Sequence, residues 1–360
     1  MDFDLSADQR ALQDGARDLL DGYSSPAQVR AHLDSGEPYD SKLWAAMADQ
    51  GWCAVAVPEA EGGIGLGWVE VAVLLGEIGA HVSPVPLAPT LVALAALTGR
   101  PEHADRVEAM AAGSSIGAVA WTSRADAVSV VDDGADRVTL TGRLGPVEAA
   151  SVADVVVVVL PDGVYLVDLE EVGRPVAQPA MDLTRSLSWL DLDGAPACRL
   201  NSAPTAAKMS AIGAVASSAE LLGACDKVLS MSSEYAKDRI QFGAPIGSFQ
   251  AVKHRCADML VDVEGMRSVT WYGAWAVENG DPDRAIAAST AKVWCADASK
   301  RVMASGLQVH GGIGFTWEHD LHLFIKRAQV SQLDYGDAAH HRRLLATALK
   351  AKVNAGVGVM

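Results

Sequence analysis

The chain has 360 residues, half of them hydrophobic, and carries a formal charge of −16 at pH 7. A chain of this length and composition can bury a large core, as one multi-lobed subunit or as two or three packed domains, which excludes intrinsic disorder. The acidic balance excludes unspecific binding to nucleic acid or to an anionic membrane, because both are polyanions. An anionic ligand therefore has to meet a local basic patch.

The cysteines and the start of the chain indicate a cytoplasmic protein. Five cysteines are scattered without the paired spacing of zinc ligands, which favours reduced thiols and predicts no metal site. The start, MDFDLSADQR, has neither the basic region nor the apolar region of a signal peptide. No later segment is an uninterrupted apolar run long enough to span a bilayer.

The first part of the chain has a helical pattern. Ser6 is placed to cap the segment DQRALQDGARDLL, and the segments SKLWAAMADQ and WVEVAVLLGEIGA follow with apolar residues at helical spacing. Between the last two lies a glycine-rich turn, VPEAEGGIGLG. We predict an N-terminal helical domain over residues 1–113.

The pattern changes to short strands and then returns to helices. Segments such as DRVTLTG, ADVVVVVL and GVYLVDL are rich in valine and separated by turn residues, which predicts a small barrel or sandwich as a middle β domain over residues 114–200. After Pro204 four or five long helical segments follow, which predicts an antiparallel helical bundle over residues 201–360. The expected fold class is thus a multidomain α+β protein.

Two segments of the last part carry chemical information. RIQFGAPIGSFQ, which begins at Arg239, ends a long helix at glycine and proline residues and can offer a guanidinium group to an anion. QVHGGIGFTWEHDLHL, which begins at Gln308, places Gly311 and Gly312 at a break between helices. Glycine lets backbone N–H groups approach a phosphate closely, although such a motif by itself also fits a simple helix-ending turn.

Together the motifs resemble those of the acyl-CoA dehydrogenase family. R-x-x-F-G-x-P-I-x-x-F-Q precedes Q-V-H-G-G-I-G-F-T-W-E, and D-L-S-x-D-Q and V-P-E-x-x-G-G-x-G-L stand before both, so the resemblance covers nearly the whole chain. It implies a helical, a β and a four-helix domain, a tetramer, and FAD bound across a subunit interface. In the family a carboxylate takes the α-proton of an acyl-CoA thioester, and flavin N5 takes the β-hydride.

The resemblance assigns six cofactor-binding residues in two sets. The first set matches positions that contact the FAD of a neighbouring subunit, and the second matches the groups that hold the ADP part of that FAD: Arg239, Phe242 and Gln250, then Gln308, Gly311 and Gly312. Without the motifs, Arg239 would be interpreted as a surface salt-bridge residue and Phe242 as a core residue.

The middle domain departs from the family pattern. Typical members have a T-E-P-x-x-G-S-D-like segment whose backbone and hydroxyl groups bind the flavin ring, whereas this chain has AVAWTSRADAVSVVDD. GRLGPVEAASVAD likewise replaces the usual G-x-K-x-x-I-T-x-G. Thr122 and Ser123 remain as hydroxyl groups that either donate to a flavin or merely end a strand. We therefore expect an incomplete flavin-ring site.

The catalytic carboxylate is missing at both positions where family members keep it. Ungapped alignment places Tyr335 at the glutamate of a Y-E-G-T-like loop and Gly213 at the alternative position. Tyrosine, with an ordinary pKa near 10, is a poor base at neutral pH. Two substitutes stay open: Glu220, about two helical turns or ~10 Å beyond Gly213, and Asp334, which needs a loop shift of one residue.

The residues after this loop are expected to be structural. Asp337 is placed to cap the last helix, and His340, His341, Arg342 and Arg343 are predicted to form a basic face at its start. Adjacent histidines point in different directions on a helix, which excludes a paired metal site. We assign no catalytic residue to the chain.

These losses suggest a chain that works with a partner. The loop D-Y-G-D-A-A-x-H and the segment G-F-T-W-E-H-D-L-H-L resemble heterotetrameric (α2β2) acyl-CoA dehydrogenases of steroid-degrading actinobacteria, in which two related subunits share each active site. Our hypothesis is a non-catalytic, site-completing subunit of such an FAD-dependent enzyme, which acts with a homologous glutamate-bearing subunit on a bulky acyl-CoA such as a steroid side-chain CoA. The alternatives are a homomeric dehydrogenase with Asp334 or Glu220 as base, a family member with other flavin chemistry, and a non-enzymatic scaffold.

Overall fold

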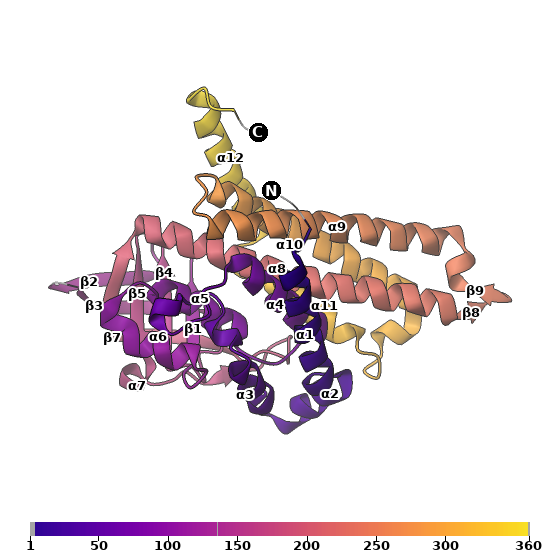
Figure 1. Cartoon of the computed structure of the whole chain (residues 1–360), viewed down its shortest axis with the longest axis horizontal. Coiled ribbons are helices and arrows are strands. Elements are labelled where there is room, and N and C mark those ends of the chain that lie inside the picture. The colour runs from indigo at the N-terminus through magenta and orange to yellow at the C-terminus, as the bar shows by residue number, and fades with distance from the viewer. Residues whose placement is uncertain (1–3, 135, 359–360) are drawn as a thin grey trace.

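The fold consists of a helical part, a β part and a second helical part, in that order along the chain (Figure 1). A computed structural model describes residues 4–134 and 136–358. The N-terminal part contains α1 (Ala7–Tyr23), α2 (Pro26–Ser35), α3 (Ser41–Asp49), α4 (Trp68–His81), α5 (Leu87–Leu97) and α6 (Ala104–Ala111). The expected fold class is confirmed, whereas the domain boundaries at residues 113 and 200 remain a prediction.

The β part is one mixed sheet in the order β1-β4-β5-β7-β3-β2, with β6 paired to β7. Its strands are β1 (Gly117–Trp121), β2 (Val128–Gly134), β3 (Arg137–Glu148), β4 (Val155–Leu160), β5 (Gly163–Asp168), β6 (Ala177–Gln178) and β7 (Leu187–Ser202). β1 and β4 are parallel, and the other pairs are antiparallel. β1 also contacts β3 without pairing to it, so the sheet curls and is closer to a barrel than to a sandwich of two sheets.

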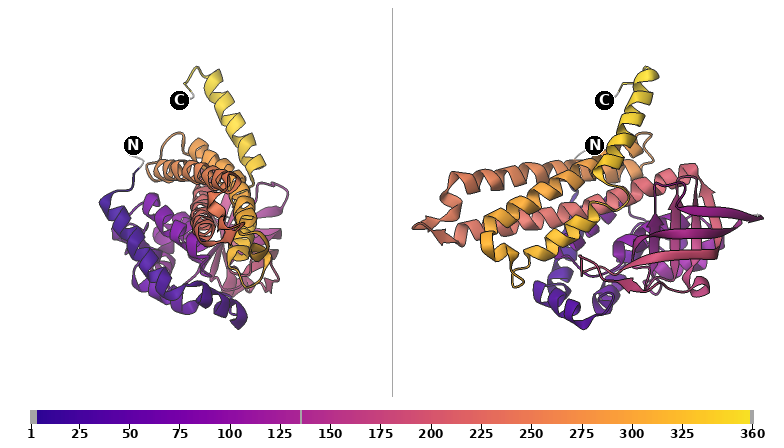
Figure 2. Two further views of the ribbon diagram at one scale, coloured as in Figure 1. Left: turned by 90° about the vertical axis from the view of Figure 1, so that its right-hand side faces the viewer. Right: turned by 180° about the vertical axis from the view of Figure 1, so that it is seen from behind.

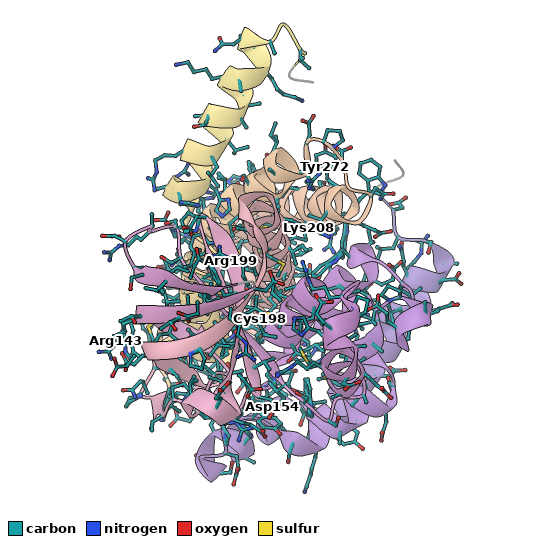
Figure 3. The ribbon with its side chains drawn as sticks, turned by 90° about the vertical axis from the view of Figure 1, so that its left-hand side faces the viewer. Arg143, Asp154, Cys198, Arg199, Lys208 and Tyr272 are labelled. Atoms are coloured by element: carbon teal, nitrogen blue, oxygen red, sulfur yellow. The ribbon has the colours of Figure 1, made fainter. Side chains whose placement is uncertain are left out.

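The start of β4 is fixed by one acidic side chain. Asp154 accepts hydrogen bonds from the Ser115 hydroxyl (2.7 Å) and the Ile116 N–H (2.9 Å), and it pairs with Arg174. Asp154 therefore ties the strand to the residues that lead into β1. Figure 3 labels Asp154, and also Arg143, Cys198 and Arg199 of the strands of this sheet.

The second helical part contains α8 (Ala203–Asp238), α9 (Gln250–Glu278), α10 (Arg284–His310), α11 (Leu321–Ser331) and α12 (Ala338–Asn354). α8, α9 and α10 pack along one another, and α12 projects from the body (Figure 2). The short hairpin β8 (Ile240–Gln241) and β9 (Ala244–Pro245) forms the far end of this bundle. Between residues 4 and 358, residue 135 excepted, no helix is long and apolar enough to cross a membrane.

Local capping signals correctly predicted where two of the helices begin. The Ser6 hydroxyl accepts a hydrogen bond from the Gln9 N–H, and the Gln9 side chain accepts one from the Ser6 N–H, which forms a capping box on α1. Asp337 caps α12 by accepting a hydrogen bond from the His340 N–H (2.7 Å). Both predictions of caps are confirmed.

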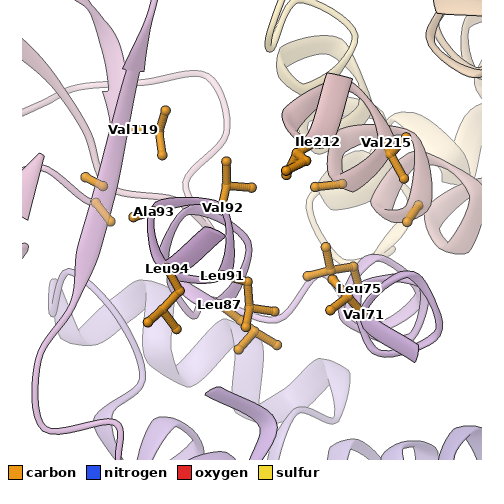
Figure 4. Packing of buried hydrophobic residues seen from close by; sticks show 14 of the residues in the cluster. Val71, Leu75, Leu87, Leu91, Val92, Ala93, Leu94, Val119, Ile212 and Val215 are labelled. Carbon is orange, nitrogen blue, oxygen red and sulfur yellow. The ribbon is translucent and has the colours of Figure 1, made fainter. Parts of the chain in front are cut away.

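α5 is buried on nearly all sides because it lies between the sheet and the second helical part. Its sequence LAPTLVALAAL is apolar all round, as expected of a helix with no solvent-facing side. Figure 4 shows Val92 on α5 between Val119 on β1 and Ile212 on α8. α5 therefore joins the three parts and forms one wall of the cleft described below.

Glycines let α4 approach α8 closely. A Cβ atom at Gly79 would overlap the backbone of Glu220, and one at Gly223 would overlap the backbone of Gly76. Close helix approach of this kind fixes the middle of α8 relative to the N-terminal part. The position of Glu220 in the site is thereby set by backbone packing.

Candidate functional site

The two positions that the resemblance assigns to the catalytic base are in contact. Tyr335 lies in the loop before α12, and its ring packs on Gly213 of α8 so closely that a Cβ atom at Gly213 would come within 3.0 Å of the ring carbons. Two positions located separately along the sequence thus meet at one point, and the tyrosine ring fills the space there. Burial raises the pKa of the Tyr335 hydroxyl above its ordinary value, so still less of the phenolate that could act as a base is present at neutral pH.

A buried histidine holds the backbone of this loop. His341 Nε2 lies 3.0 Å from the Tyr335 carbonyl oxygen, and His341 Nδ1 lies 3.1 Å from the Ser289 hydroxyl. Burial lowers the pKa of His341 to about 4, so the ring is neutral, with Nε2 donating to the carbonyl. The prediction of a basic face is therefore wrong for His341, because tertiary packing encloses this side chain. His340 instead packs edge-on against Trp121.

One buried guanidinium gathers the acidic residues of the site. Arg185 precedes β7, and its side chain is 2% exposed. Its Nη1 lies 3.0 Å from Asp334 and 3.5 Å from Glu148, Nη2 pairs with Glu220, and Nε lies 3.9 Å from Asp182. The two substitute bases, Glu220 and Asp334, are thus not free carboxylates but partners of the same cation.

A second arginine supports this cluster from behind. Arg327 on α11 donates from Nε to Asp182 (2.9 Å) and from Nη2 to the Thr184 hydroxyl (2.6 Å). Nη2 also donates to the carbonyl oxygens of Val82 (3.4 Å), Ser83 (3.2 Å) and Thr184 (3.3 Å). Arg327 therefore connects the segment that carries Arg185 to α11 and to the residues after α4.

A buried lysine adds a third cation. Lys292 Nζ donates to the Ser217 hydroxyl (2.7 Å) and to the Ser331 carbonyl oxygen (2.6 Å), and burial lowers its pKa to about 8. The buried region thus holds three cationic side chains and four carboxylates: Arg185, Arg327 and Lys292 against Glu148, Asp182, Glu220 and Asp334. One negative charge is left uncompensated when all seven are ionised.

Glu148 is a carboxylate of this group whose pKa is raised. Burial is the largest cause that raises its pKa to about 7; Arg185 counteracts the rise, and Glu220 adds to it. Two carboxylates pair with Nη1 of Arg185, and Glu148 is the more distant of them, at 3.5 Å against 3.0 Å for Asp334. In the motif G-x-K-x-x-I-T-x-G, counted from Gly142, Glu148 stands at the threonine. Sequence reasoning missed both Glu148 and Arg185, although an acid at this motif position was a usable signal for the former.

We predict that Glu148 makes the protein less stable as the pH rises from about 4.5 to about 7. The folded carboxyl has the higher pKa, so between the two values the folded state binds more protons than the unfolded state, and stability falls with rising pH. The loss is at most about 3.5 kcal/mol, because the pKa rises by about 2.5 units and each unit corresponds to about 1.4 kcal/mol. Urea unfolding at several pH values measures it.

Glu148→Gln is the matched variant for this prediction. Glutamine cannot ionise, so the difference in unfolding free energy between variant and parent should grow through this pH window and stay constant above it. A difference that does not change with pH would show that the Glu148 pKa is not raised in the folded state.

A cleft of about 450 Å³ opens beside the cluster. α5, β1, the end of β3, α8, α11 and the loop before α12 form its walls. Most of the lining is apolar, and its acidic residues are Glu148, Glu220 and Asp334, with Tyr335 beside them. A concave apolar site with a few convergent polar groups and a shifted pKa is the typical form of a ligand-binding or active site.

The residues of this cleft do not fit a complete flavin-ring site. Glu148 replaces the motif threonine, the Tyr335 ring stands at both base positions, and the surrounding charge is negative. The Thr122 hydroxyl accepts a hydrogen bond from the Arg124 N–H (3.1 Å), as a residue at a strand end does. Within residues 4–134 and 136–358, no group of three or more histidine, cysteine, aspartate or glutamate side chains is arranged to hold a metal ion.

The residues assigned to the ADP part of FAD lie at the far end of the bundle. Stacking of His310 on Tyr235, with ring centroids 4.7 Å apart, brings the end of α10 against the last turn of α8. The hairpin with Arg239 and Phe242 follows α8 directly, and Phe242 is 95% exposed. Gln250 and Gln308 are exposed, and the Cβ positions of Gly311 and Gly312 are open. The structure brings the two segments to one surface, and their role remains a prediction.

This end of the bundle exposes large apolar side chains. The exposed residues come from both segments: Ile240, Phe242, Phe249, Ile313, Phe315 and Trp317. Large apolar side chains that are exposed in this way are typical of an interface between proteins. Phe242 therefore does not belong to the core.

Comparisons with known proteins agree with this geometry. The family models "Acyl-CoA dehydrogenase, N-terminal domain" and "Acyl-CoA dehydrogenase, C-terminal domain" match residues 6–113 and 205–350. Acyl-CoA dehydrogenase IpdE2 of Mycobacterium tuberculosis is 35% identical over 330 residues, which cover 90% of this chain and 92% of that protein. In solved structures, the chain resembles one in the ChsE4-ChsE5 complex from Mycobacterium tuberculosis (TM-score 0.90, 29% identity, 97% and 99% covered). A variant of the Tcur3481-Tcur3483 steroid ACAD is equally similar (TM-score 0.90, 31% identity, 96% and 99% covered).

Proposed function

Since this chain belongs to the acyl-CoA dehydrogenase family, we propose that it is the site-completing, non-catalytic subunit of a heteromeric FAD-dependent member. The partner is a homologous chain that supplies the catalytic glutamate and the flavin-ring pocket. The reaction is α,β-desaturation of a bulky acyl-CoA thioester, such as a steroid side-chain CoA.

The packing of Tyr335 on Gly213 is the observation that carries the proposal. It leaves no carboxylate at either base position, and the two acids considered as substitutes, Glu220 and Asp334, are both paired with Arg185. A homomeric enzyme with Asp334 or Glu220 as base would have to break a buried ion pair before each proton transfer, which is costly. This argues against the homomeric alternative.

In this proposal, the surface at the far end of the bundle contributes to the FAD site of the partner subunit. Arg239 offers a positive charge to a pyrophosphate on a chain that is otherwise strongly acidic, and open backbone at Gly311 and Gly312 allows close approach of phosphate oxygens. FAD, when bound there, supplies the hydride acceptor of the dehydrogenation. Phe242 and its apolar neighbours provide the contact area with the partner.

Two of the similar solved structures support a heteromer and a bulky substrate. Both are described by a pair of chain names, and one of them is called a steroid enzyme. The substrate class rests on this likeness to other proteins.

Flavin content tests the proposal. We expect the purified chain to show little visible flavin absorbance alone, and about one FAD per pair of chains when it is co-purified with a glutamate-bearing homologue. About one FAD per chain without a partner would contradict the proposal. It would favour a homomeric enzyme with Asp334 or Glu220 as its base. Absence of flavin in every pairing would instead support a scaffold.

We predict that Arg239→Ala weakens FAD binding by the paired complex about tenfold or more, because a hydrogen bond to a charged group contributes about 1.5–3 kcal/mol. Titration of the flavin-free complex with FAD measures the dissociation constant. Arg124→Ala is the control, since Arg124 is exposed and its ion pair is with Asp126 of its own turn. Equal affinities of both variants and the parent complex would show that Arg239 does not contact the cofactor.

A further inference from the structure

We propose that the cleft beside Arg185 binds an uncharged, mostly apolar ring molecule that carries a hydroxyl group, and that this hydroxyl donates a hydrogen bond to Glu148. The inference rests on the proposed function in one respect only, namely that this chain's cleft holds no flavin ring of its own.

The shape and lining of the cleft favour an apolar ring. Its volume of about 450 Å³ lies within the usual range of small-molecule sites. Val92 and Val119 line the cleft, and so do Met181 and Leu333, which are both about half exposed and which an apolar ligand would remove from water. The volume and the apolar lining of the cleft therefore fit a small apolar ligand.

Two aromatic side chains lie next to each other in the wall of the cleft. The rings of Trp121 and Tyr335, whose centroids are 6.4 Å apart at an angle of 54°, both line the cleft. Trp121 is held in place because its Nε1–H donates to the Ser210 hydroxyl (2.8 Å). Aromatic rings prefer offset or edge-to-face partners, so a fixed pair of this kind favours a ring-shaped ligand.

The Glu148 carboxylate can accept further hydrogen bonds. Its Oε2 lies 3.5 Å from Arg185 Nη1, beyond the usual range of an N–H···O hydrogen bond, whereas Asp334 lies 3.0 Å from the same nitrogen and Glu220 is paired with Nη2. A carboxylate accepts up to about four hydrogen bonds. A hydroxyl from the ligand would therefore satisfy an acceptor that the protein leaves underused.

The local charge excludes an anionic ligand. The three cations of the cluster are already outnumbered by four carboxylates, so a carboxylate or phosphate in the cleft would meet repulsion without a free positive group. A hydroxyl carries no charge, and it can also accept a hydrogen bond when Glu148 is protonated. These conditions distinguish the ligand from the acyl-CoA and the FAD of the proposed function.

Three probes of one skeleton test the proposal by calorimetric titration of the full chain: 2-naphthol, 2-methoxynaphthalene and 2-naphthoate. We expect 2-naphthol to bind about tenfold or more tightly than 2-methoxynaphthalene, which lacks the donor, and 2-naphthoate to bind most weakly. Equal binding of 2-naphthol and 2-naphthoate would overturn the proposal. So would the absence of binding by all three.

Two variants locate the binding at Glu148. Glu148→Leu should abolish the preference for 2-naphthol over 2-methoxynaphthalene, because no acceptor remains at this position; an unchanged preference would overturn the proposal. Glu148→Gln keeps an acceptor oxygen but not the charge. It should therefore keep most of the preference and lose the pH dependence described below.

The parent chain should bind 2-naphthol more tightly as Glu148 ionises between pH 5.5 and 7.5, because a carboxylate is the stronger acceptor. The charged or titratable groups that face Glu148 are Arg185, Arg327, Glu220, Asp334 and Tyr335. The pH range ends below the Lys292 pKa of about 8. The same pH dependence in Glu148→Gln would overturn the assignment of Glu148.

The outcome is separable from that of the proposed function. The titrations need neither partner nor flavin, so failure of 2-naphthol to bind leaves the flavin stoichiometry of the pair untouched. Conversely, about one FAD in the chain alone would contradict the proposed function before any probe is added.

Discussion

Replacing Arg185 with methionine is expected to lower the free energy of unfolding by about 3–5 kcal/mol. Methionine keeps much of the side-chain volume but leaves Glu220 and Asp334 without their cation in a region where the Arg185 and Glu220 side chains are only 2% and 5% exposed. Loss of one partner from a buried ion pair costs more than the pair contributes, because the remaining charge cannot be solvated. Urea unfolding measures the effect.

A surface arginine is the matched control for this variant. Arg124 also pairs with an aspartate, Asp126, but both side chains are more than 70% exposed. Arg124→Met should change stability by no more than about 1 kcal/mol. Losses of equal size in the two variants would show that the Arg185 cluster is not a buried network.

Removal of a second charge should partly rescue the Arg185 variant. With Glu220→Gln added, the side chain left behind is neutral, and the double variant should lose less than the sum of the two single losses by about 1 kcal/mol or more. Additive losses would mean that Arg185 and Glu220 act independently, contrary to their contact.

Gly213→Ala is expected to destabilise the protein by about 1–3 kcal/mol, although alanine is the better helix former. The added methyl group would overlap the Tyr335 ring. That ring has little room to move, since the carbonyl of Tyr335 is hydrogen-bonded to His341 and its backbone has a φ of 55°. Thermal and urea unfolding measure the loss.

Gly15→Ala is the matched control for the Gly213 variant. Gly15 lies within α1, and a Cβ atom there would have nothing within 4 Å, so the same change should stabilise the protein by about 0.5–1 kcal/mol. Tyr335→Gly should remove most of the cost of Gly213→Ala, because it removes the ring and because glycine adopts a positive φ without strain. Effects of the same sign at Gly15 and Gly213 would contradict the packing described.

Several features follow from residues that are close in sequence. The caps at Ser6 and Asp337 each act on residues three positions ahead, so a short pattern contains all the interacting groups. The family and fold class also follow from motifs that are each continuous. The two positions that the resemblance assigns to the base were found by counting, because helices and motif spacings keep Gly213 and Tyr335 at countable distances from Arg239 and the glycine motif. The structure brings these two residues into contact, and the loss of the base stays a prediction.

The sequence by itself thus determined the fold class, the family, and the two positions that lack a carboxylate. Only the tertiary structure decided where the remaining acids act. Arg185 stands 35 residues from Glu220 and 149 from Asp334, and nothing in its neighbourhood along the chain indicates that it is buried. Burial decides the state of Glu148 and His341 in the same way, since both pKa shifts come chiefly from loss of water around the side chain. Desolvation depends on segments that are distant in sequence and meet only when the chain has folded.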